Sequence, residues 1–461
     1  MSTSNDRFDV VIVGGRCSGS PLATFLRRAG LSVCVLDRAE FPSDTLSSHF
    51  FQVSGLSIMK KLGVLERVHA TGAPSMTRVY MKFDDVDLSG DVRLRPDDPS
   101  TPIVCVRRVS LDVLLVDNAR SAGVELRTGS RVTGLIHRNG RVAGVKVENG
   151  SGRRSSIHAD LVVGADGRLS SVGRMVGARR YHVAPNERFN SWAYFRNVPL
   201  ESPPTCYFHR RGDDFVIAGP ADDGLFIVIV APSLGSLDAY RADSERWFKN
   251  IVAGCEPVAQ LLANAERASK FRGLTRFEGF FREASGPGWV LTGDAGHFKD
   301  PGPGQGISDA LRQAEALSQA IVRGMGSAPR LDRELRRWWR WRDRDAFQHY
   351  WFAFDVGRAG PISPVRLEIM RQLARDDETR KDFIDLFIHR AFPSDVFSSF
   401  RVSRALFKLM SDQQMRRGAL ADAVAIVREE LRRRFSTWWP SYDGKEAVDE
   451  AHTDHQPSPA Q

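Results

Sequence analysis

Apolar and polar residues alternate along the first forty positions in a pattern that predicts strand, turn, helix and strand. Residues 10–13 form a continuous apolar run, which is typical of a parallel strand buried on both faces. Gly14 and Gly15 interrupt this run, and residues 18–29 then place apolar side chains at helical spacing before Gly30. A second apolar run, residues 31–36, ends at Asp37. Together these segments predict a βαβ unit with a glycine-rich turn at the start of its helix.

Two later apolar strands also run into glycine and aspartate. The first ends in the sequence GADG at residues 164–167, and the second, WVLTGD, ends in Asp294. A loop rich in proline and glycine follows at residues 301–306, and a helix is predicted from near Ile307 because apolar residues continue at helical spacing. So many glycines before a helix favour a close approach of a ligand to the backbone.

The rest of the chain divides into segments that differ in their pattern of apolar and polar residues. Asn139-Gly140 and Asn149-Gly150 separate alternating apolar runs and predict an antiparallel meander. Short strand patterns at residues 178–285 predict an antiparallel sheet, whose aromatic residues either line an apolar pocket or pack the sheet. Residues 329–440 have helical patterns, and we interpret their aromatic-rich segment as core or pocket wall rather than as a membrane or nucleic-acid surface. The polar tail, 441–461, is predicted to be disordered.

Composition and charge narrow the class of protein. The chain has 461 residues and no apolar run of about twenty residues that could span a bilayer, and its N-terminus lacks the pattern of a signal peptide. Five cysteines without C-x-x-C spacing argue against a disulfide framework or a zinc site, and they predict a reduced, cytoplasmic environment. The net charge of +9 is spread along the sequence, which favours a solvated surface over binding of nucleic acid.

The first glycine-rich turn has the chemistry of a dinucleotide site. Free N–H groups and the dipole at a helix N-terminus favour a pyrophosphate, and Asp37 stands where such units carry the carboxylate that binds a ribose. Arg16 occupies the place of the middle glycine in G-x-G-x-x-G. Its side chain has three options: it tilts the loop, points away from the ligand, or adds a guanidinium to the phosphates. A turn that binds nothing is the alternative.

The three glycine-containing segments, in this order and spacing, make the chain resemble the group A flavoprotein monooxygenases, the para-hydroxybenzoate hydroxylase-like family. The chain also resembles the geranylgeranyl reductase and flavin-halogenase branches of the same superfamily. The resemblance implies an α/β fold: a Rossmann-like FAD-binding domain of the glutathione reductase type, with an inserted antiparallel β-sheet substrate domain and C-terminal helices. The corresponding segments are 1–177 and 286–328 for the FAD-binding domain, 178–285 for the sheet domain, 329–440 for the helices and 441–461 for the tail.

The resemblance also implies which residues hold FAD. The glycine turn binds the pyrophosphate, Asp37 the adenosine ribose and Asp294 the ribitol chain, while the backbone at Val132 meets the adenine. The loop from Pro301 borders the isoalloxazine ring. The full set of implied cofactor-binding residues is Gly14, Gly15, Arg16, Gly19, Asp37, Arg38, Arg108, Val132, Asp166, Asp294, Pro301, Gly304, Gln305 and Gly306.

The implied activity is that of an FAD-dependent monooxygenase. NAD(P)H reduces the flavin, O2 gives a C4a-hydroperoxyflavin, and the distal oxygen passes to a small, largely apolar organic substrate that is hydroxylated or epoxidised. His49 and His297 are the candidate catalytic residues, with His209 a weaker third, and a structural role is the alternative for each. The chain departs from the family at Gly173, where an arginine is usual in a segment that serves both FAD and the nicotinamide.

Other activities remain open from the sequence. A flavin halogenase needs a lysine near the flavin, for which Lys82 is the candidate, but the W-x-W-x-I-P motif of many halogenases is missing. A flavin-dependent double-bond reductase and a redox-neutral flavoprotein acting on a natural-product intermediate are compatible with the same segments. A separate flavin reductase is the expected partner if the chain does not itself use NAD(P)H. A basic module that binds nucleic acid or a membrane surface is the alternative outside the enzymes.

Overall fold

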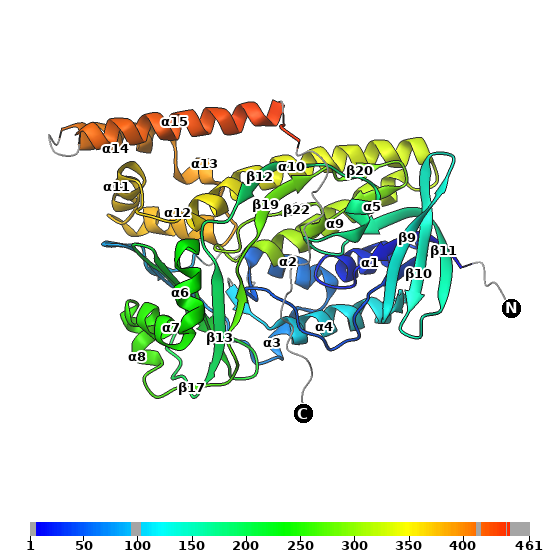
Figure 1. The fold of residues 1–461 in the computed structure, drawn as a ribbon, viewed down its shortest axis with the longest axis horizontal. Coiled ribbons are helices and arrows are strands. Elements are labelled where there is room, and N and C mark those ends of the chain that lie inside the picture. Colours follow the sequence, from blue (N-terminus) through cyan, green and yellow to red (C-terminus); the bar gives the residue numbers. More distant parts are fainter. Residues whose placement is uncertain (1–5, 94–102, 412–415, 439, 443–461) are drawn as a thin grey trace.

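The computed structural model describes residues 6–93, 103–411, 416–438 and 440–442, which are organised around two large sheets (Figure 1). The first sheet has an antiparallel meander of β9 (Ser130–Arg138) and β10 (Arg141–Asn149) attached to its strand β11. The predicted α/β fold class, βαβ unit and meander are confirmed. The parallel core of this sheet runs in the order β21 (Trp289–Leu291), β11 (Arg154–Gly164), β1 (Arg7–Val13), β2 (Val33–Leu36) and β8 (Glu125–Arg127).

Both faces of β1 are buried, as its continuous apolar run predicts. Val10 and Ile12 pack with the helices α1 (Gly19–Arg28) and α9 (Gly306–Gly324), whereas Val11 packs toward the meander. The long helix α10 (Ala328–Gly357) lies along α9, and α4 (Arg108–Ser121) contacts α1. The glycine turn therefore leaves β1 at the carboxyl edge of the parallel strands, which is where open α/β sheets bind ligands.

The second sheet is mixed rather than purely antiparallel. Three of its strands come from before residue 178, and β14 pairs in parallel with β4. This pairing was missed because no sequence pattern near residues 78–91 indicates the distant partner. The strands of this sheet are β4 (Arg78–Phe83), β5 (Val86–Asp87), β6 (Gly90–Asp91), β13 (Asn190–Arg196), β14 (Thr205–Arg211), β15 (Asp214–Pro220), β16 (Phe226–Val230), β17 (Glu266–Arg267) and β18 (Arg272–Leu274).

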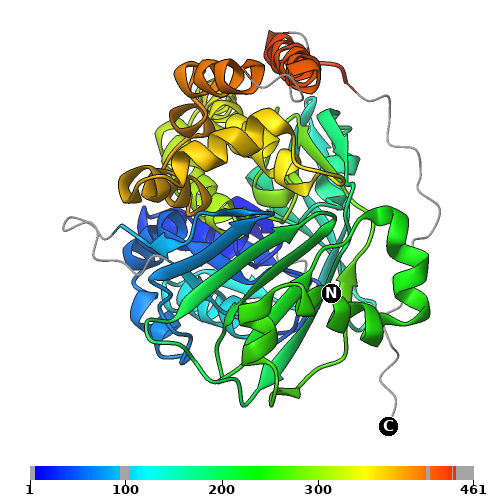
Figure 2. The same ribbon diagram turned by 90° about the vertical axis from the view of Figure 1, so that its left-hand side faces the viewer.

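Different elements cover the two faces of the second sheet (Figures 1 and 2). The outer face packs against α6 (Leu237–Ala242), α7 (Ser244–Ala253) and α8 (Glu256–Leu261). The inner face packs against the C-terminal helices and β3. Of the five aromatic residues expected to line a pocket or pack the sheet, Trp192, Tyr194 and Phe208 face inward, and Phe195 and Tyr207 face outward.

The C-terminal region is helical, as predicted, and the described residues contain no helix that is long and apolar enough to span a bilayer. Tyr442, at the start of the predicted tail, pairs with Tyr181, and residues 443–461 lie outside the described part. The C-terminal helices are α11 (Pro364–Leu373), α12 (Asp377–Phe387), α13 (Pro393–Val396), α14 (Ser399–Met410) and α15 (Arg416–Trp438). The remaining elements used below are α2 (Val53–Leu62), α5 (Ser171–Met175), β3 (Phe50–Gln52), β7 (Ile103–Cys105), β12 (Arg180–Pro185), β19 (Glu278–Arg282) and β22 (His297–Phe298).

Candidate active site

The glycine turn after β1 leaves no room for side chains at two of its positions. Gly14 has a φ of +103°, and a Cβ there would come within 2.3 Å of the Ala165 carbonyl oxygen. A Cβ at Gly19 would come within 1.8 Å of the Gly14 carbonyl oxygen. The Ala165 N–H also donates to the Val13 carbonyl, so the first and second glycine segments touch each other. The backbone at the start of α1 is therefore bare, as close contact with a pyrophosphate requires.

Asp37 follows β2 and lies beside this turn. Its carboxylate accepts hydrogen bonds from the N–H groups of Gly15 at 2.8 Å and Ala39 at 2.9 Å. Its carbonyl accepts from the Ser130 N–H, which brings the start of β9 alongside. Val132 in β9 buries its side chain in the core, so only its backbone is available to a ligand. Arg38 is exposed.

Arg16 turns its side chain away from the glycine turn. Its guanidinium lies 2.6 Å from the Asp112 carboxylate and donates to the carbonyl and the hydroxyl of Ser43. Arg108 binds the same carboxylate through two hydrogen bonds, at 2.9 and 3.1 Å. Asp112 is fully buried, so two cations share one anion and the cluster carries a net charge of +1. Asp112 lies four residues after Arg108 on α4, a spacing that places the two side chains on the same side of the helix and that is visible in the sequence.

Asp294 follows β21 at the same edge of the sheet. Its side chain is exposed, yet burial among protein groups raises its carboxyl pKa to about 6, and the nearby Arg108 guanidinium opposes this rise. A side chain that water reaches while protein surrounds it lies in the wall of a recess. The Asp294 carboxylate can accept hydrogen bonds from the hydroxyls of a bound polyol there.

The second glycine segment acts mainly on its own structure. The Asp166 carboxylate accepts from the N–H groups of Ser171 and Val172 and from two serine hydroxyls, so it caps the start of α5. Gly173, where the family has an arginine, leaves a space beside α5. Arg282 from β19 places its guanidinium there, 2.8 Å from a Cβ built at Gly173. The space beside Gly173 is therefore occupied by an arginine from a distant strand, while Arg174, next to Gly173, is exposed.

The loop from Pro301 to Gly304, which we call the ring loop, is held from both sides. The Gly304 N–H donates to the Pro301 carbonyl, and Gly304 has a φ of +69°. The Gln52 amide donates to the carbonyls of Pro303 and Gly304 and accepts from the Ser308 hydroxyl. Gln52 is a holding residue that the sequence did not reveal, because only the fold brings β3 beside this loop.

The N-terminus of α9 faces open space. Within the described part of the chain, no atom beyond the neighbouring residues lies within 4 Å of a Cβ built at Gly306, and the first hydrogen bond of the helix runs from the Asp309 N–H to the Gln305 carbonyl. The N–H groups that precede Asp309 can therefore stabilise negative charge on a ligand. The Gln305 side chain points elsewhere, because its amide nitrogen donates to the carbonyls of Leu386 and Phe387.

His49 lies next to the ring loop. A Cβ at Gly304 would contact Phe50 and Ser48, the two neighbours of His49, and the His49 ring lies 5.9 Å from the ring of Tyr194. Burial and the nearby Arg108 guanidinium lower the pKa of His49 to about 3. Its Nδ1 accepts from the Arg108 N–H, so the proton of the neutral ring resides on Nε2.

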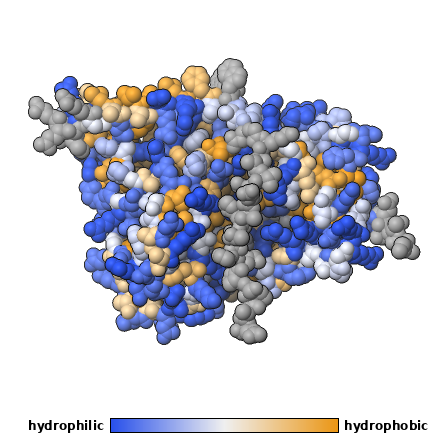
Figure 3. Space-filling model, viewed as in Figure 1, coloured by the Kyte–Doolittle hydropathy of each residue, from blue (hydrophilic) through white to orange (hydrophobic). Residues whose placement is uncertain are grey.

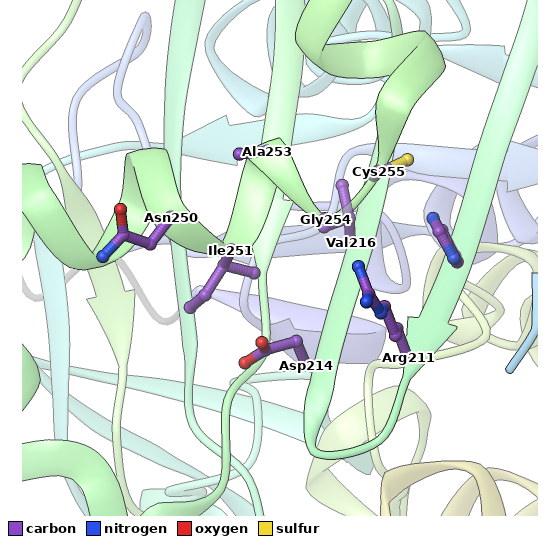
Figure 4. A pocket seen from close by; sticks show the side chains of 9 residues that line it. Arg211, Asp214, Val216, Asn250, Ile251, Ala253, Gly254 and Cys255 are labelled. Atoms are coloured by element: carbon purple, nitrogen blue, oxygen red, sulfur yellow. The ribbon is translucent and has the colours of Figure 1, made fainter.

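His297 and His209 lie in packed surroundings. The centroid of the His297 ring lies 4.7 Å from that of Phe281, and burial lowers the pKa of His297 to about 3. Its Nε2 is buried and has no hydrogen-bond partner among the residues that the structure describes. His209 is on the outer face of the second sheet, in the wall of a cavity of about 370 Å³ beneath α7 and α8. Figure 4 shows that side chains from the β14–β15 hairpin and the α7–α8 turn line this cavity. Lys82 alternates with inward-facing Met81 and Phe83 and so lies on the same outer face.

A second cavity of about 370 Å³ is lined in part by Tyr194, the residue whose ring lies 5.9 Å from that of His49. Tyr194, Leu225, Arg107 and Arg272 are among its lining residues. Arg107 is held by two oxygens of the buried Asp222. The Tyr194 hydroxyl and the Trp192 indole N–H, both on the inner face of the sheet, are buried without a hydrogen-bond partner among the described residues. Buried donors usually have a hydrogen-bond partner in native proteins, so these two donors are available to a bound water or ligand.

These residues form a line whose chemistry fits FAD. Asp37 lies at one end, the glycine turn with the positive Arg16–Asp112–Arg108 cluster in the middle, and Asp294 with the ring loop at the other end. A carboxylate suits a ribose, free N–H groups and a net positive charge suit a pyrophosphate, and the start of α9 suits a flavin that becomes negative on reduction. The described residues contain no cluster suited to a metal ion.

Comparisons with known proteins agree with this chemistry. A family model described as an FAD binding domain matches residues 7–333. The 6-methylpretetramide 4-monooxygenase of Streptomyces rimosus is 26% identical over 328 residues, which cover 69% of this chain and 76% of that protein. The menaquinone reductase of Mycolicibacterium smegmatis is 26% identical over 343 residues, covering 69% and 78%. The solved structure of the flavin-dependent brominase Bmp2 has the same fold, with a TM-score of 0.70 and 20% identity over 87% of this chain and 98% of that chain.

Proposed function

The chain belongs to the FAD-binding-domain family of the group A flavoprotein monooxygenase superfamily and is an FAD-dependent oxidoreductase, and we propose that it acts as a monooxygenase. It uses NAD(P)H and O2 to hydroxylate or epoxidise a small, largely apolar organic substrate. The observation that carries this proposal is the cavity that Tyr194 and Leu225 line together with Arg107 and Arg272. The ring of His49 lies 5.9 Å from the Tyr194 ring, and the Tyr194 hydroxyl is buried without a hydrogen-bond partner among the described residues.

The chain's own residues would act as positioning groups. Bound FAD supplies the redox chemistry and the activation of oxygen, and the protein binds it, orients the substrate and excludes water. The glycine turn and the Arg16–Asp112–Arg108 cluster hold the pyrophosphate, Asp37 the ribose, and Asp294 the ribitol chain. The N–H groups at the start of α9 stabilise negative charge at the ring loop.

His49 would serve as a hydrogen-bond donor rather than as a base. Its Nδ1 is occupied by the Arg108 N–H, and its pKa of about 3 keeps the ring neutral at physiological pH. Nε2–H therefore remains available to an oxygen atom of the substrate. The fixed tautomer lets His49 orient the substrate without a change of charge.

Neither Lys82 nor Lys299 is placed as the halogenase alternative requires of its lysine. Lys82 lies on the outer face of the sheet, away from the ring loop. Lys299 is much closer to the loop, but its ammonium group is buried and bound to Asp309 at 2.7 Å and to the Gln305 amide oxygen at 2.9 Å. A lysine held in this way is not free to take an oxidised halide from the flavin.

The test is anaerobic reduction of the FAD-loaded protein by NADPH or NADH, followed by admission of air. A monooxygenase is expected to lose its absorbance near 450 nm with either nicotinamide and to regain it with O2, and an oxygenated product is expected when a panel of phenols and quinones is supplied. Reduction by nicotinamide followed by saturation of a double bond would replace the proposal with a reductase. Failure of both nicotinamides, with turnover restored by a flavin reductase and halide, would replace it with a halogenase.

A further inference from the structure

The two last helices expose a set of large apolar side chains to solvent. Phe400 and Phe407 on α14 are 74% and 78% exposed, and Val424 and Phe435 on α15 are 66% and 65% exposed. We call this set the apolar stripe, and its members are Phe400, Phe407, Met410, Leu420, Val424, Val427, Leu431 and Phe435. Figure 3 shows hydrophobic residues gathered along the upper edge of the molecule, where Figure 1 places α14 and α15.

The part of the stripe on α15 is one side of a helix whose other side is anchored to the body of the protein. Positions 420, 424, 427, 431 and 435 of α15 recur at spacings of three and four, so their side chains project from the same side. On the opposite side, Ala419 is fully buried, and Arg433 pairs with Asp355 at 2.7 Å. The helix is therefore docked on the body of the protein, and the stripe is its outward side.

Arginines border the stripe and have no acid to neutralise them. Arg404, Arg416, Arg428 and Arg432 are exposed, and none of them forms a salt bridge within the described part of the chain.

The acids of α15 are already engaged. The Asp422 carboxylate accepts from the Val365 N–H, Glu429 pairs with Arg433 and Arg358, and Glu430 pairs with Arg434. The surface around the stripe is thus apolar in the centre and positively charged at the rim.

We propose that the apolar stripe docks the protein onto the surface of a bilayer that contains anionic lipids. A helix surface with exposed apolar side chains in its centre and arginines at its rim lies in the plane of such an interface, with its apolar side chains among the acyl chains. Anionic headgroups neutralise the bordering arginines, each of which contributes about 1 kcal/mol near such a surface. The docking is peripheral and does not depend on the proposed oxygenation.

The other candidates to cover the stripe have the wrong chemistry. A second copy of this chain would bring the same unpaired arginines face to face, where like charges repel each other. The segment 443–461 is acidic and matches the arginines in charge, but its single large aliphatic residue, Val448, cannot fill a stripe of eight large side chains. A lipid surface offers both the apolar volume and the negative charge that the stripe lacks.

The test is sedimentation of the FAD-loaded full-length chain with vesicles of phosphatidylcholine, with and without phosphatidylglycerol. We expect binding to the anionic vesicles and at least tenfold weaker binding to the neutral ones. The triple variant Val424→Asn, Leu431→Gln, Phe435→Gln should lose binding to anionic vesicles by at least tenfold. Arg428→Gln with Arg432→Gln should weaken it by about fivefold per arginine, since 1 kcal/mol corresponds to about that factor.

The matched control removes exposed apolar side chains elsewhere. Leu200→Gln with Val322→Gln changes two exposed residues outside the stripe and should bind the vesicles like the unmodified chain. All variants are checked for bound FAD and for melting temperature. Equal vesicle binding by the triple variant, or no binding by the unmodified chain, would overturn the proposal. If the unmodified chain forms a dimer and does not bind vesicles, and the triple variant is a monomer, the stripe is instead an interface between two copies of the chain.

Discussion

Replacement of Arg16 by methionine tests whether this residue serves FAD through its charge or through direct contact. The guanidinium lies 2.6 Å from Asp112 and also bonds Ser43, so it is turned away from the glycine turn. Arg108 keeps two hydrogen bonds to Asp112 in the variant. The Arg108–Asp112 pair beside the proposed pyrophosphate site therefore remains, but the net charge of the cluster falls from +1 to zero.

The size of the effect follows from Coulomb's law. A unit charge about 10 Å from a phosphate, in an effective dielectric of about 20, contributes about 1.7 kcal/mol. Screening at physiological ionic strength reduces this figure by roughly half. We therefore expect the dissociation constant of FAD to rise about fourfold in Arg16→Met, since every 1.4 kcal/mol corresponds to about a factor of ten. The free energy of unfolding of the apoprotein should fall by about 1 to 2 kcal/mol, because a partly buried charged hydrogen bond is lost.

The assay is a titration of the apoprotein with FAD at low and at physiological salt, in which quenching of the flavin fluorescence reports binding. Arg241→Gln, on α6, removes one positive charge from an exposed position far from the cluster and is the matched control. A loss of more than about a hundredfold in Arg16→Met would refute the reasoning, because it would require direct contact with the phosphates. An affinity equal to that of the control would refute it in the other direction.

Three further predictions address the ring loop and its surroundings. Asn in place of His49 keeps an acceptor for the Arg108 N–H and tolerates the φ of 64°, so His49→Asn should bind FAD normally and be reduced normally but oxygenate substrate about 10- to 100-fold more slowly. Because burial raises the pKa of Asp300 to about 7, above its unfolded value, the folded state holds this proton more tightly and ionisation destabilises it as pH rises to 7. Asp300→Asn should therefore melt like the unmodified apoprotein at pH 4 and at a higher temperature at pH 8, and a constant difference across this range would contradict the assignment. Gln52→Ala frees two ring-loop carbonyls, so the free energy of unfolding should fall by about 2 kcal/mol and FAD should bind about tenfold more weakly, as measured by denaturant unfolding and titration.

The sequence predicted the parts of the site that depend on local chain geometry. A buried strand, a glycine turn and a helix follow one another within about thirty residues, and their arrangement is set by backbone sterics and by apolar periodicity. Parallel strands share one carboxyl edge, so Asp37, Ala165 and Asp294 meet there once β1, β2, β11 and β21 are recognised. The sequence could also have revealed Asp112, which stands one helical turn after Arg108.

The parts that escaped prediction depend on pairings between distant segments. Arg282 lies beside Gly173 across more than a hundred residues of chain, and Gln52 reaches the ring loop across some 250 residues. Neither has a periodicity or a neighbouring motif that reports its partner. The direction of the Arg16 side chain also could not be predicted from the sequence. Which of its three possible orientations it adopts depends on neighbouring groups, such as Asp112, that only the fold brings close. The pairing of charged side chains at the site can thus be determined only from the three-dimensional structure, whereas the backbone around the site can be predicted from the sequence.

The connection between the C-terminal helices and the ring loop explains why the chain needs residues beyond the FAD-binding domain. Gln305 stands at the start of α9, yet its amide binds the carbonyls at the end of α12, and the buried Lys299 holds its oxygen. Lys299 in turn pairs with Asp309 in the first turn of α9, whose pKa is lowered mainly by that ammonium group against the effect of burial. A displacement of α12 would therefore withdraw hydrogen bonds from the residue that precedes α9, the helix proposed to face the flavin. The helices that carry the apolar stripe are packed on α11, which contacts α12, so the surface proposed to meet the membrane and the loop proposed to meet the flavin are connected through packed helices.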